Sequence, residues 1–159
     1  MGQQFEELPE WEFAVRTNDV EATYTVVATR DGGIRGNASG EDIDDLLRDM
    51  RRWVTATEVG LLVRKALSEV EELMQAAFER AGESGIEGTA LDQAGLEDGG
   101  AVVLDYLAHN EAGLALDHLL YMITEPSLPV SVGTRRDVLR AATLIGDARL
   151  VTRAKSQLG

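Results

Sequence analysis

The sequence predicts an α+β protein that is mostly α, with an N-terminal β-hairpin or small meander packed on a helical bundle of about five to six helices. Three observations predict this fold. Apolar and β-branched residues alternate within residues 1–40, apolar residues recur at helical spacing over most of the remaining chain, and glycines gather between residues 82 and 100. The 159 residues are interpreted as a single domain. Segment 82–100 is its candidate internal boundary, between residues 1–81 and residues 101–159.

The predicted strands come first. Trp11–Arg16 alternates apolar and polar residues, and Thr23–Arg30 is rich in β-branched residues. The turn signal Asp31-Gly32-Gly33 precedes a short candidate third strand, Ile34–Gly36. So small a sheet is not stable alone, so it is expected to pack on the helices that follow.

Two helices are predicted next. Ser39 is placed to cap the first helix, with Asp42 three residues later, and the β-branched run Val54–Thr57 is expected to end it. The second helix carries a nearly unbroken apolar stripe from Val59 to Phe78 and stops at Gly82. Lys65 and Glu69, four residues apart, are expected on its solvent face.

The C-terminal part predicts a helical hairpin and two further helices. Helices are expected over about residues 101–109 and 111–125, with Asn110 as the cap of the second and Pro126 beyond its end. Another helix follows Pro129-Val130-Ser131 and closes at Gly146. Asp147 is placed to cap a last helix that ends near Leu158.

Composition excludes several classes of protein. The chain contains no cysteine, which rules out disulfides and thiolate zinc sites and fits a cytoplasmic location. No apolar run approaches the roughly 20 residues of a membrane span, and the N-terminus lacks the features of a signal peptide. The formal net charge is -13, and residues 1–100 hold 22 acids and 9 bases, whereas residues 101–159 hold 6 of each. Such a charge repels nucleic acids and anionic membranes, although solubility alone accounts for many acidic surfaces.

No catalytic site can be assembled from the motifs, so the sequence predicts a non-enzyme without cofactors or metals. Asp105 precedes His109 by four residues, but no second histidine lies near enough to complete a metal site. Glycines 32, 33 and 36 lack the spacing of a phosphate-binding loop. The basic residues after Arg135 are balanced by acids and lack aromatic neighbours, which indicates a solvated helix face and not a nucleic-acid site.

A protein-binding surface is the remaining interpretation. Acids at the start of the first helix and along the second predict a face that fits a basic cleft, where complementary charge raises the association rate and excludes nucleic acid. The alternative is that these acids only solvate the exposed faces of the two helices and bind no partner. The acids are Glu41, Asp42, Asp44, Asp45 and Asp49 in the first helix and Glu69, Glu71, Glu72 and Glu79 in the second.

Residues 106–123 read YLAHNEAGLALDHLLYMI, and Pro129-Val130-Ser131 follows. This pattern resembles the MafI-type immunity proteins of bacterial polymorphic-toxin systems, over about residues 96–146. Gly113 is expected to let the two helices approach closely, with Leu114, Leu116, Leu119, Leu120 and Ile123 filling their interface.

The resemblance implies an antitoxin that binds and neutralises a cognate secreted toxin domain in the cytoplasm of the producing cell. A nuclease or nucleic-acid deaminase with a basic cleft fits the acidic surface, and an acidic regulatory adaptor or nucleic-acid mimic is the alternative. His118 is expected to pack against the helix that begins near Ser131. The polar side of the hairpin adds Asp105, Glu111, Asp117 and Tyr121 to the candidate partner-binding residues, with helix capping and turn support as their alternative role.

Overall fold

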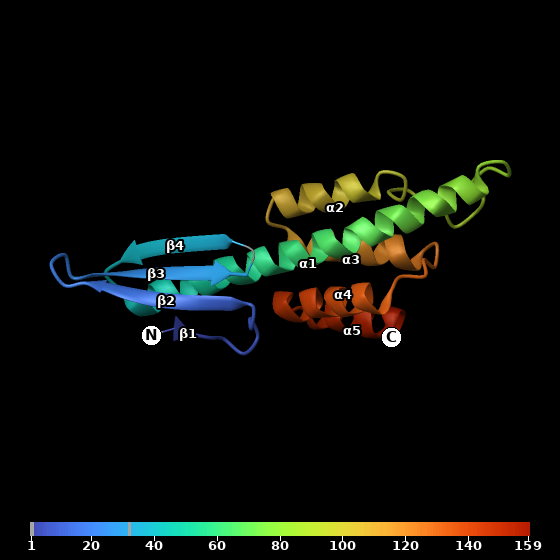
Figure 1. Ribbon diagram of the computed structural model, residues 1–159. Coiled ribbons are helices and arrows are strands. Elements are labelled where there is room, and N and C mark those ends of the chain that lie inside the picture. Colours follow the sequence, from blue (N-terminus) through green and yellow to red (C-terminus); the bar gives the residue numbers. More distant parts are fainter. Residues whose placement is uncertain (1, 32) are drawn as a thin grey trace. The chain divides into compact units, whose positions relative to one another are not determined.

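The computed structural model describes residues 2–31 and 33–159 and has the predicted α+β architecture, with strands at the N-terminus and helices after them (Figure 1). The chain forms two compact units, Met1–Thr57 and Glu58–Gly159, called unit 1 and unit 2 below. The division falls inside the first helix, whereas the glycine-rich segment 82–100 lies within unit 2. No helix of the described residues is both long enough and apolar enough to cross a membrane.

Unit 1 contains an antiparallel sheet in the order β1-β2-β3-β4. The two central strands were predicted from their alternation, the last strand is four residues longer than expected, and the short β1 was not predicted. In the turn before β4, Gly33 donates its N–H to the Arg30 carbonyl, while Gly32 of the predicted turn lies outside the described residues. The strands are β1 Gly2–Gln3, β2 Trp11–Asn18, β3 Thr23–Arg30 and β4 Ile34–Gly40.

The core of unit 1 lies between one face of this sheet and the first turns of the first helix. Trp11 and Phe13 alternate along β2 and are fully buried, and Met50 and Val54 are buried on the helix. Side chains of alternate strand residues share a face, so a period-two pattern fills this core from one side. The opposite face of the sheet is largely polar and exposed, which is usual for an antiparallel sheet.

Helix α1 runs without interruption from Ile43 to Ala81, so the predicted break at Val54–Thr57 is wrong. Tertiary packing explains the difference, because Val54 is fully buried and the Thr57 hydroxyl donates a hydrogen bond to the Trp53 carbonyl oxygen. Low helix propensity costs only tenths of a kcal/mol per residue, less than the burial of one such side chain gains.

The start of α1 also differs from expectation. Ser39 still belongs to β4, where its hydroxyl contacts that of Thr25 at 2.8 Å. Asp42 caps the helix instead, because its Oδ1 accepts hydrogen bonds from the N–H groups of Asp44 and Asp45. A carboxylate at this position also compensates the positive end of the helix dipole.

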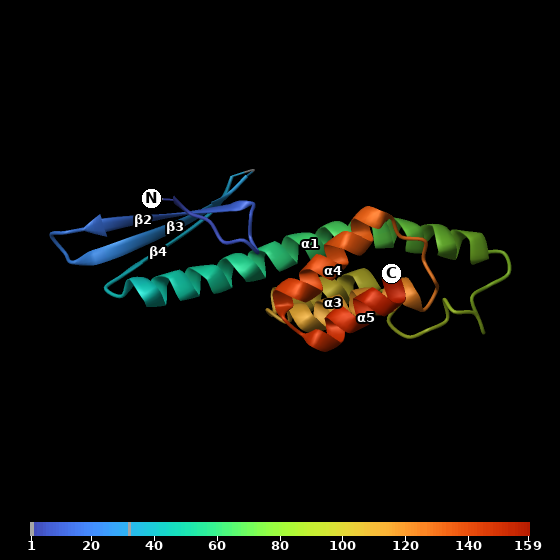
Figure 2. The ribbon, with the colours of Figure 1, turned by 90° about the horizontal axis from the view of Figure 1, so that it is seen from below.

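Unit 2 contains the rest of α1 and four further helices. Helix α3 lies at their centre, because α2, α4 and α5 all contact it (Figure 2). Ser131, Gly146 and Asp147 occupy the capping positions predicted for them. Asn110 does not cap α3; it adopts a positive φ of 58° in the turn, and Glu111 occupies the cap position without a side-chain bond. The helices are α2 Gly99–Ala108, α3 Ala112–Thr124, α4 Val132–Ile145 and α5 Ala148–Leu158.

The interface of the hairpin is only partly as predicted. Leu116, Leu119 and Leu120 are fully buried, whereas Leu114 is 50% exposed. A Cβ added at Gly113 would meet no atom within 4 Å, so this glycine does not permit a close approach of helices. Leu114 lies on the exposed side of α3 with Asp117, because helix residues three apart share a face, whereas Ala115 and Leu116 face the core.

The close approach lies instead at the start of α2, at a glycine pair that the sequence assigned to the preceding loop. Gly99 and Gly100 are both buried. A Cβ on Gly99 would lie 2.7 Å from the Met122 sulfur, and one on Gly100 would overlap the Glu71 carboxylate. Residues 82–98 form turns and bends.

Candidate partner-binding surfaces

The acids at the start of α1 are exposed. Glu41, Asp42, Asp44, Asp45 and Asp49 all belong to unit 1, and Asp42 also serves as the helix cap. The carboxylate of Asp45 lies 2.6 Å from the Arg48 guanidinium. Asp49 lies 3.8 Å from Arg52, and both pairs are so exposed that each contributes little to stability. The five carboxylates therefore form a hydrated, negatively charged helix start.

One stripe of this part of α1 runs beside β4. The Leu46 side chain is the nearest neighbour of Gly40, and the Trp53 ring covers Gly36 so closely that a Cβ there would overlap it. Trp53 also packs edge to face on Trp11, with ring centroids 5.7 Å apart, yet it remains 41% exposed. The glycine is thus required by the indole, and the indole is left partly open to solvent.

The second group of candidates belongs to unit 2 and begins with Asp105. His109 Nδ1 lies 2.8 Å from the Asp105 carbonyl oxygen and 3.6 Å from its carboxylate. The hydrogen bond to the carbonyl and the nearby carboxylate raise the pKa of His109. The pair is the surface interaction expected from its spacing. No group of three or more His, Cys, Asp or Glu residues positioned to hold a metal occurs within residues 2–31 and 33–159.

The other three candidates have different surroundings. Glu111 is exposed at the start of α3. Asp117 forms an ion pair with Arg153 of α5, and the Tyr121 hydroxyl donates to the Ala94 carbonyl at 3.0 Å. His118 does not pack against α4 as expected; its Nε2 lies 3.0 Å from the Gly95 carbonyl oxygen. Asp117, His118 and Tyr121 therefore link α3 to α5 and to the loop 82–98, a role that differs from the helix capping and turn support considered as the alternative.

Charge within unit 2 is divided along the chain. Residues 66–125 contain thirteen acids and one base, Arg80, whereas residues 126–159 contain two acids and six bases. Most of the acids are exposed, on the second half of α1, the loop 82–98 and α2. The acidic excess is therefore present in both units, and the two groups of candidate residues belong to different units.

Glu69 was placed on the solvent face of α1, but it holds the start of α4. One carboxylate oxygen accepts the Ser131 N–H at 2.7 Å, and the other accepts the hydroxyls of Ser131 and Thr134. These hydrogen bonds, that from Thr134 first, lower the pKa of Glu69. Lys65 likewise pairs with Asp137 of α4 at 2.7 Å instead of with Glu69.

Glu58 is a buried acid that the sequence interpretation did not single out. Its side chain is fully buried, and its carboxylate lies 3.8 Å from the Arg140 guanidinium of α4. A pattern in the sequence marks it, because Val54 and Leu62 stand four residues before and after it on the same buried side of α1. A charged residue inside an apolar stripe is expected to have a buried partner.

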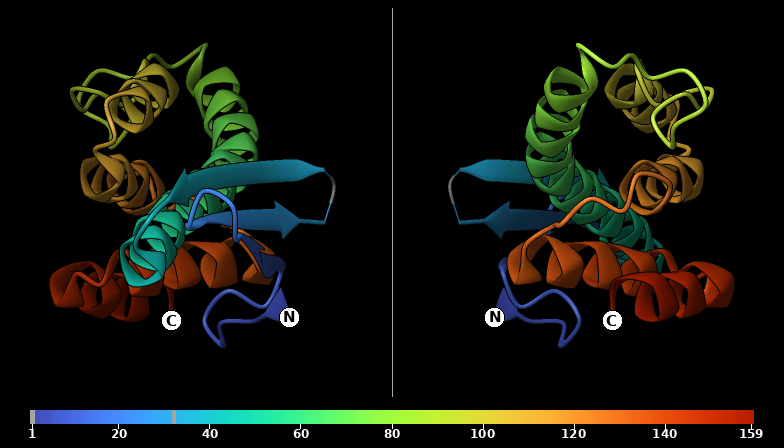
Figure 3. Two further views of the ribbon diagram at one scale, coloured as in Figure 1. Left: turned by 90° about the vertical axis from the view of Figure 1, so that its left-hand side faces the viewer. Right: turned by 90° about the vertical axis from the view of Figure 1, so that its right-hand side faces the viewer.

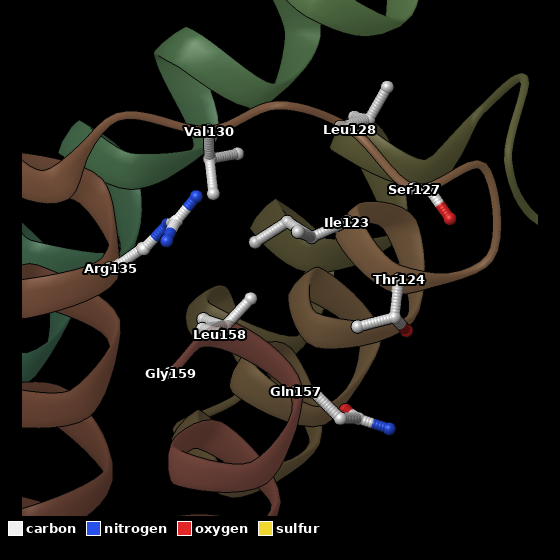
Figure 4. Close-up of a pocket in the computed structure, with 9 residues that line it drawn as sticks. All are labelled: Ile123, Thr124, Ser127, Leu128, Val130, Arg135, Gln157, Leu158 and Gly159. Atoms are coloured by element: carbon white, nitrogen blue, oxygen red, sulfur yellow. The ribbon is translucent and has the colours of Figure 1, made fainter.

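A cavity of about 310 Å³ lies within unit 2 (Figure 4). The side chains of Ile123, Val130 and Leu158 point into it, and Arg135 reaches toward the same space. None of the candidate partner-binding residues lines it. Its walls are formed by Ile123, Thr124, Ser127, Leu128, Val130, Arg135, Gln157, Leu158 and Gly159, a set without a carboxylate, histidine or cysteine side chain.

The chain matches no protein-family model, no curated protein and no solved structure. The geometry of its own residues is therefore the basis of the functional argument.

Proposed function

We propose that this protein is an immunity protein that binds a cognate toxin domain in the cytoplasm and neutralises it by stoichiometric occlusion. The toxin domain would be a nuclease or nucleic-acid deaminase with a basic cleft. The proposal joins the acidic surface to the resemblance of residues 96–146 to MafI-type immunity proteins.

The observation that carries the proposal is the set of exposed carboxylates at the start of α1. Glu41 and Asp44 are exposed, and no cation within the described part of the chain pairs with either. By contrast, the carboxylates of Glu58 and Glu69 on the same helix are engaged by α4. The free carboxylates are the ones available to a partner.

The physical consequence is a fast and salt-sensitive association. Carboxylates that face a basic cleft raise the encounter rate, and they occupy the positions that nucleic-acid phosphates would take. Screening by salt shortens the reach of such charges to about 8 Å at physiological ionic strength. Binding through this surface is therefore expected to weaken as salt concentration rises.

The test uses the toxin domain encoded beside this gene. Purified protein and toxin are expected to elute together as a 1:1 complex, and the protein is expected to abolish toxicity when both are expressed in one cell. Charge reversal at Glu41 and Asp44 should slow association and flatten its salt dependence, whereas the same reversal at the exposed Glu83 and Glu87 of unit 2 is the matched control. Absence of both complex and protection would refute the proposal.

A further inference from the structure

Strand β4 forms an open edge of the sheet of unit 1. Among the described residues, the order β1-β2-β3-β4 leaves β4 with a hydrogen-bonded neighbour only on its β3 side, and Figure 3 shows the strand at the margin of the sheet. Its register with β3 is continuous from Ile34 to Gly40, without a bulge. An edge of this kind presents unpaired backbone groups to solvent.

The hydrogen bonding in the turn between β3 and β4 determines which β4 residues present these unpaired backbone groups. The hydrogen bond from the Gly33 N–H to the Arg30 carbonyl closes a three-residue loop, so the pair Arg30 and Ile34 is a hydrogen-bonded pair. Bonded and non-bonded pairs alternate in an antiparallel ladder. The N–H and C=O groups that point away from β3 therefore belong to Arg35, Asn37 and Ser39.

This edge lacks the features that usually protect one. The strand IRGNASG contains no proline and no lysine, and Arg35 is its single charged residue. At the opposite side of the sheet, β1 pairs with Phe13 and Ala14 and so covers part of β2. The unprotected edge is therefore β4.

The row of α1 residues beside β4 determines which partner side chains would be favoured at this edge. Successive helix residues turn by about 100°, so Leu46, Asp49 and Trp53 lie in one row that starts after the cap residue Asp42. Leu46 and Trp53 contact β4, whereas Arg51 lies over the Phe5 ring at 5.0 Å on the other flank of the helix. A half-exposed indole, one turn after the exposed Asp49 carboxylate, thus lies beside the open strand.

We propose that the β4 edge is the docking site for an extended, basic segment of the partner protein, which adds to the sheet as a further strand. The backbone groups of Arg35, Asn37 and Ser39 bind the segment, Trp53 packs against an apolar side chain, and Asp42 and Asp49 attract lysine or arginine. The inference rests on the proposed function, because it names the surface by which the toxin is held.

Hydrogen exchange of the full chain tests the site. The first probe is a capped seven-residue peptide that alternates lysine and valine, and the second is the toxin domain from the neighbouring gene. Both are expected to slow hydrogen exchange of the Arg35, Asn37 and Ser39 amides. Exchange of the amides in the turn between β2 and β3, near Val20, should not change. A peptide that alternates glutamate and valine, and a lysine–valine peptide with methylated backbone nitrogens, should give no protection.

Two substitutions at residue 37 distinguish the contribution of its backbone N–H from that of its side chain. Asn37→Pro removes one outward N–H without removing a bond to β3, and is expected to weaken peptide and toxin binding by about tenfold or more. Asn37→Thr changes the same side chain, keeps the N–H and is expected to retain protection of the edge. Tryptophan fluorescence and thermal unfolding of both variants show whether unit 1 is still folded.

The outcomes distinguish this inference from the proposed function. If the toxin binds wild type and Asn37→Pro equally and the three amides stay unprotected, the docking site is wrong and the inhibitor proposal stands. If no toxin binds, the inhibitor proposal falls and the lysine–valine peptide alone decides whether the edge accepts a strand. Self-association of the free protein that is lost in Asn37→Pro would identify a second copy as the occupant and overturn the inference.

Discussion

Helix α1 carries carboxylates with opposite roles in the two units. In unit 1, the acids from Asp42 to Asp49 are exposed, and Asp42 is the helix cap. In unit 2, Glu58 is buried beside Arg140, and Glu69 accepts three hydrogen bonds from the start of α4. Within the described residues, the sheet gives these acids no hydrogen bond or ion pair, whereas α4 gives Glu58 and Glu69 several. The neighbouring element, and not the residue type, decides whether a carboxylate is available for binding.

The two units can be followed with different spectroscopic probes. Both tryptophans, Trp11 and Trp53, belong to unit 1, and the helices after residue 81 belong to unit 2. Tryptophan fluorescence therefore reports on unit 1, and helical circular dichroism reports mostly on unit 2. Coincident unfolding curves from the two probes would indicate one cooperative transition.

The largest effect is expected from Glu58→Ala. This change removes a fully buried side chain that lies beside the Arg140 guanidinium, and truncation of a side chain this deeply buried costs about 2–3 kcal/mol. Urea unfolding followed by circular dichroism should show the loss. Asp44→Ala is the control in unit 1, followed by tryptophan fluorescence, and should change the free energy of unfolding by no more than about 0.5 kcal/mol. Equal effects of the two substitutions would contradict the contrast drawn between the units.

Gly36→Ala should destabilise unit 1 by about 1–3 kcal/mol, because the added Cβ would overlap the Trp53 ring. Tryptophan fluorescence during urea unfolding measures the change. In the background of Trp53→Leu, the same substitution should cost distinctly less, since the ring that it displaces is gone. A cost that is identical in both backgrounds would show that the indole does not impose the glycine.

Ser131→Ala should cost about 1 kcal/mol in unit 2. The Ser131 hydroxyl accepts the Thr134 N–H as the α4 cap and donates to Glu69, so both bonds are lost. The measurement is urea unfolding followed by circular dichroism. Ser68→Ala, an exposed position of α1, should leave stability unchanged or slightly raised, and a similar loss there would point to a nonspecific effect.

The smallest effect is a dependence on pH. Because the folded state lowers the pKa of Glu69, its contribution is complete above the unfolded pKa of roughly 4.3 and is lost as pH falls through the folded value. The stability difference between wild type and Glu69→Gln should therefore shrink as pH falls below that point. Glu72→Gln, at an exposed position, should show no such trend in the same titration.

Local patterns predicted most of the fold. The alternation of Trp11 and Phe13 placed β2, and the signals at Ser131, Gly146 and Asp147 placed the ends of α4 and α5. The predicted break in α1 was wrong because tertiary packing with residues distant in the sequence decides whether the helix continues through Val54–Thr57. Val54 is weakly helical by itself and becomes favourable only when it is buried.

The candidate surfaces were less predictable than the fold. Exposure of the acids from Glu41 to Asp49 agrees with their charge density. Sequence spacing placed Lys65 and Glu69 on the solvent face of α1, but it cannot show that α4 approaches both residues. The open edge of β4 was also missed. An edge position depends on the order of strands in the sheet, and the residue pattern of a single strand does not show that order.

The continuity of α1 across Thr57 determines where the helix opens first. A helix frays from its ends, so the amides near Thr57, in the middle of α1, should exchange more slowly than those near Ile43 or Ala81. A ligand that binds the folded first turns makes fraying from that end rarer. Binding there would therefore slow amide exchange near Ile43 and leave exchange near Ala81 unchanged.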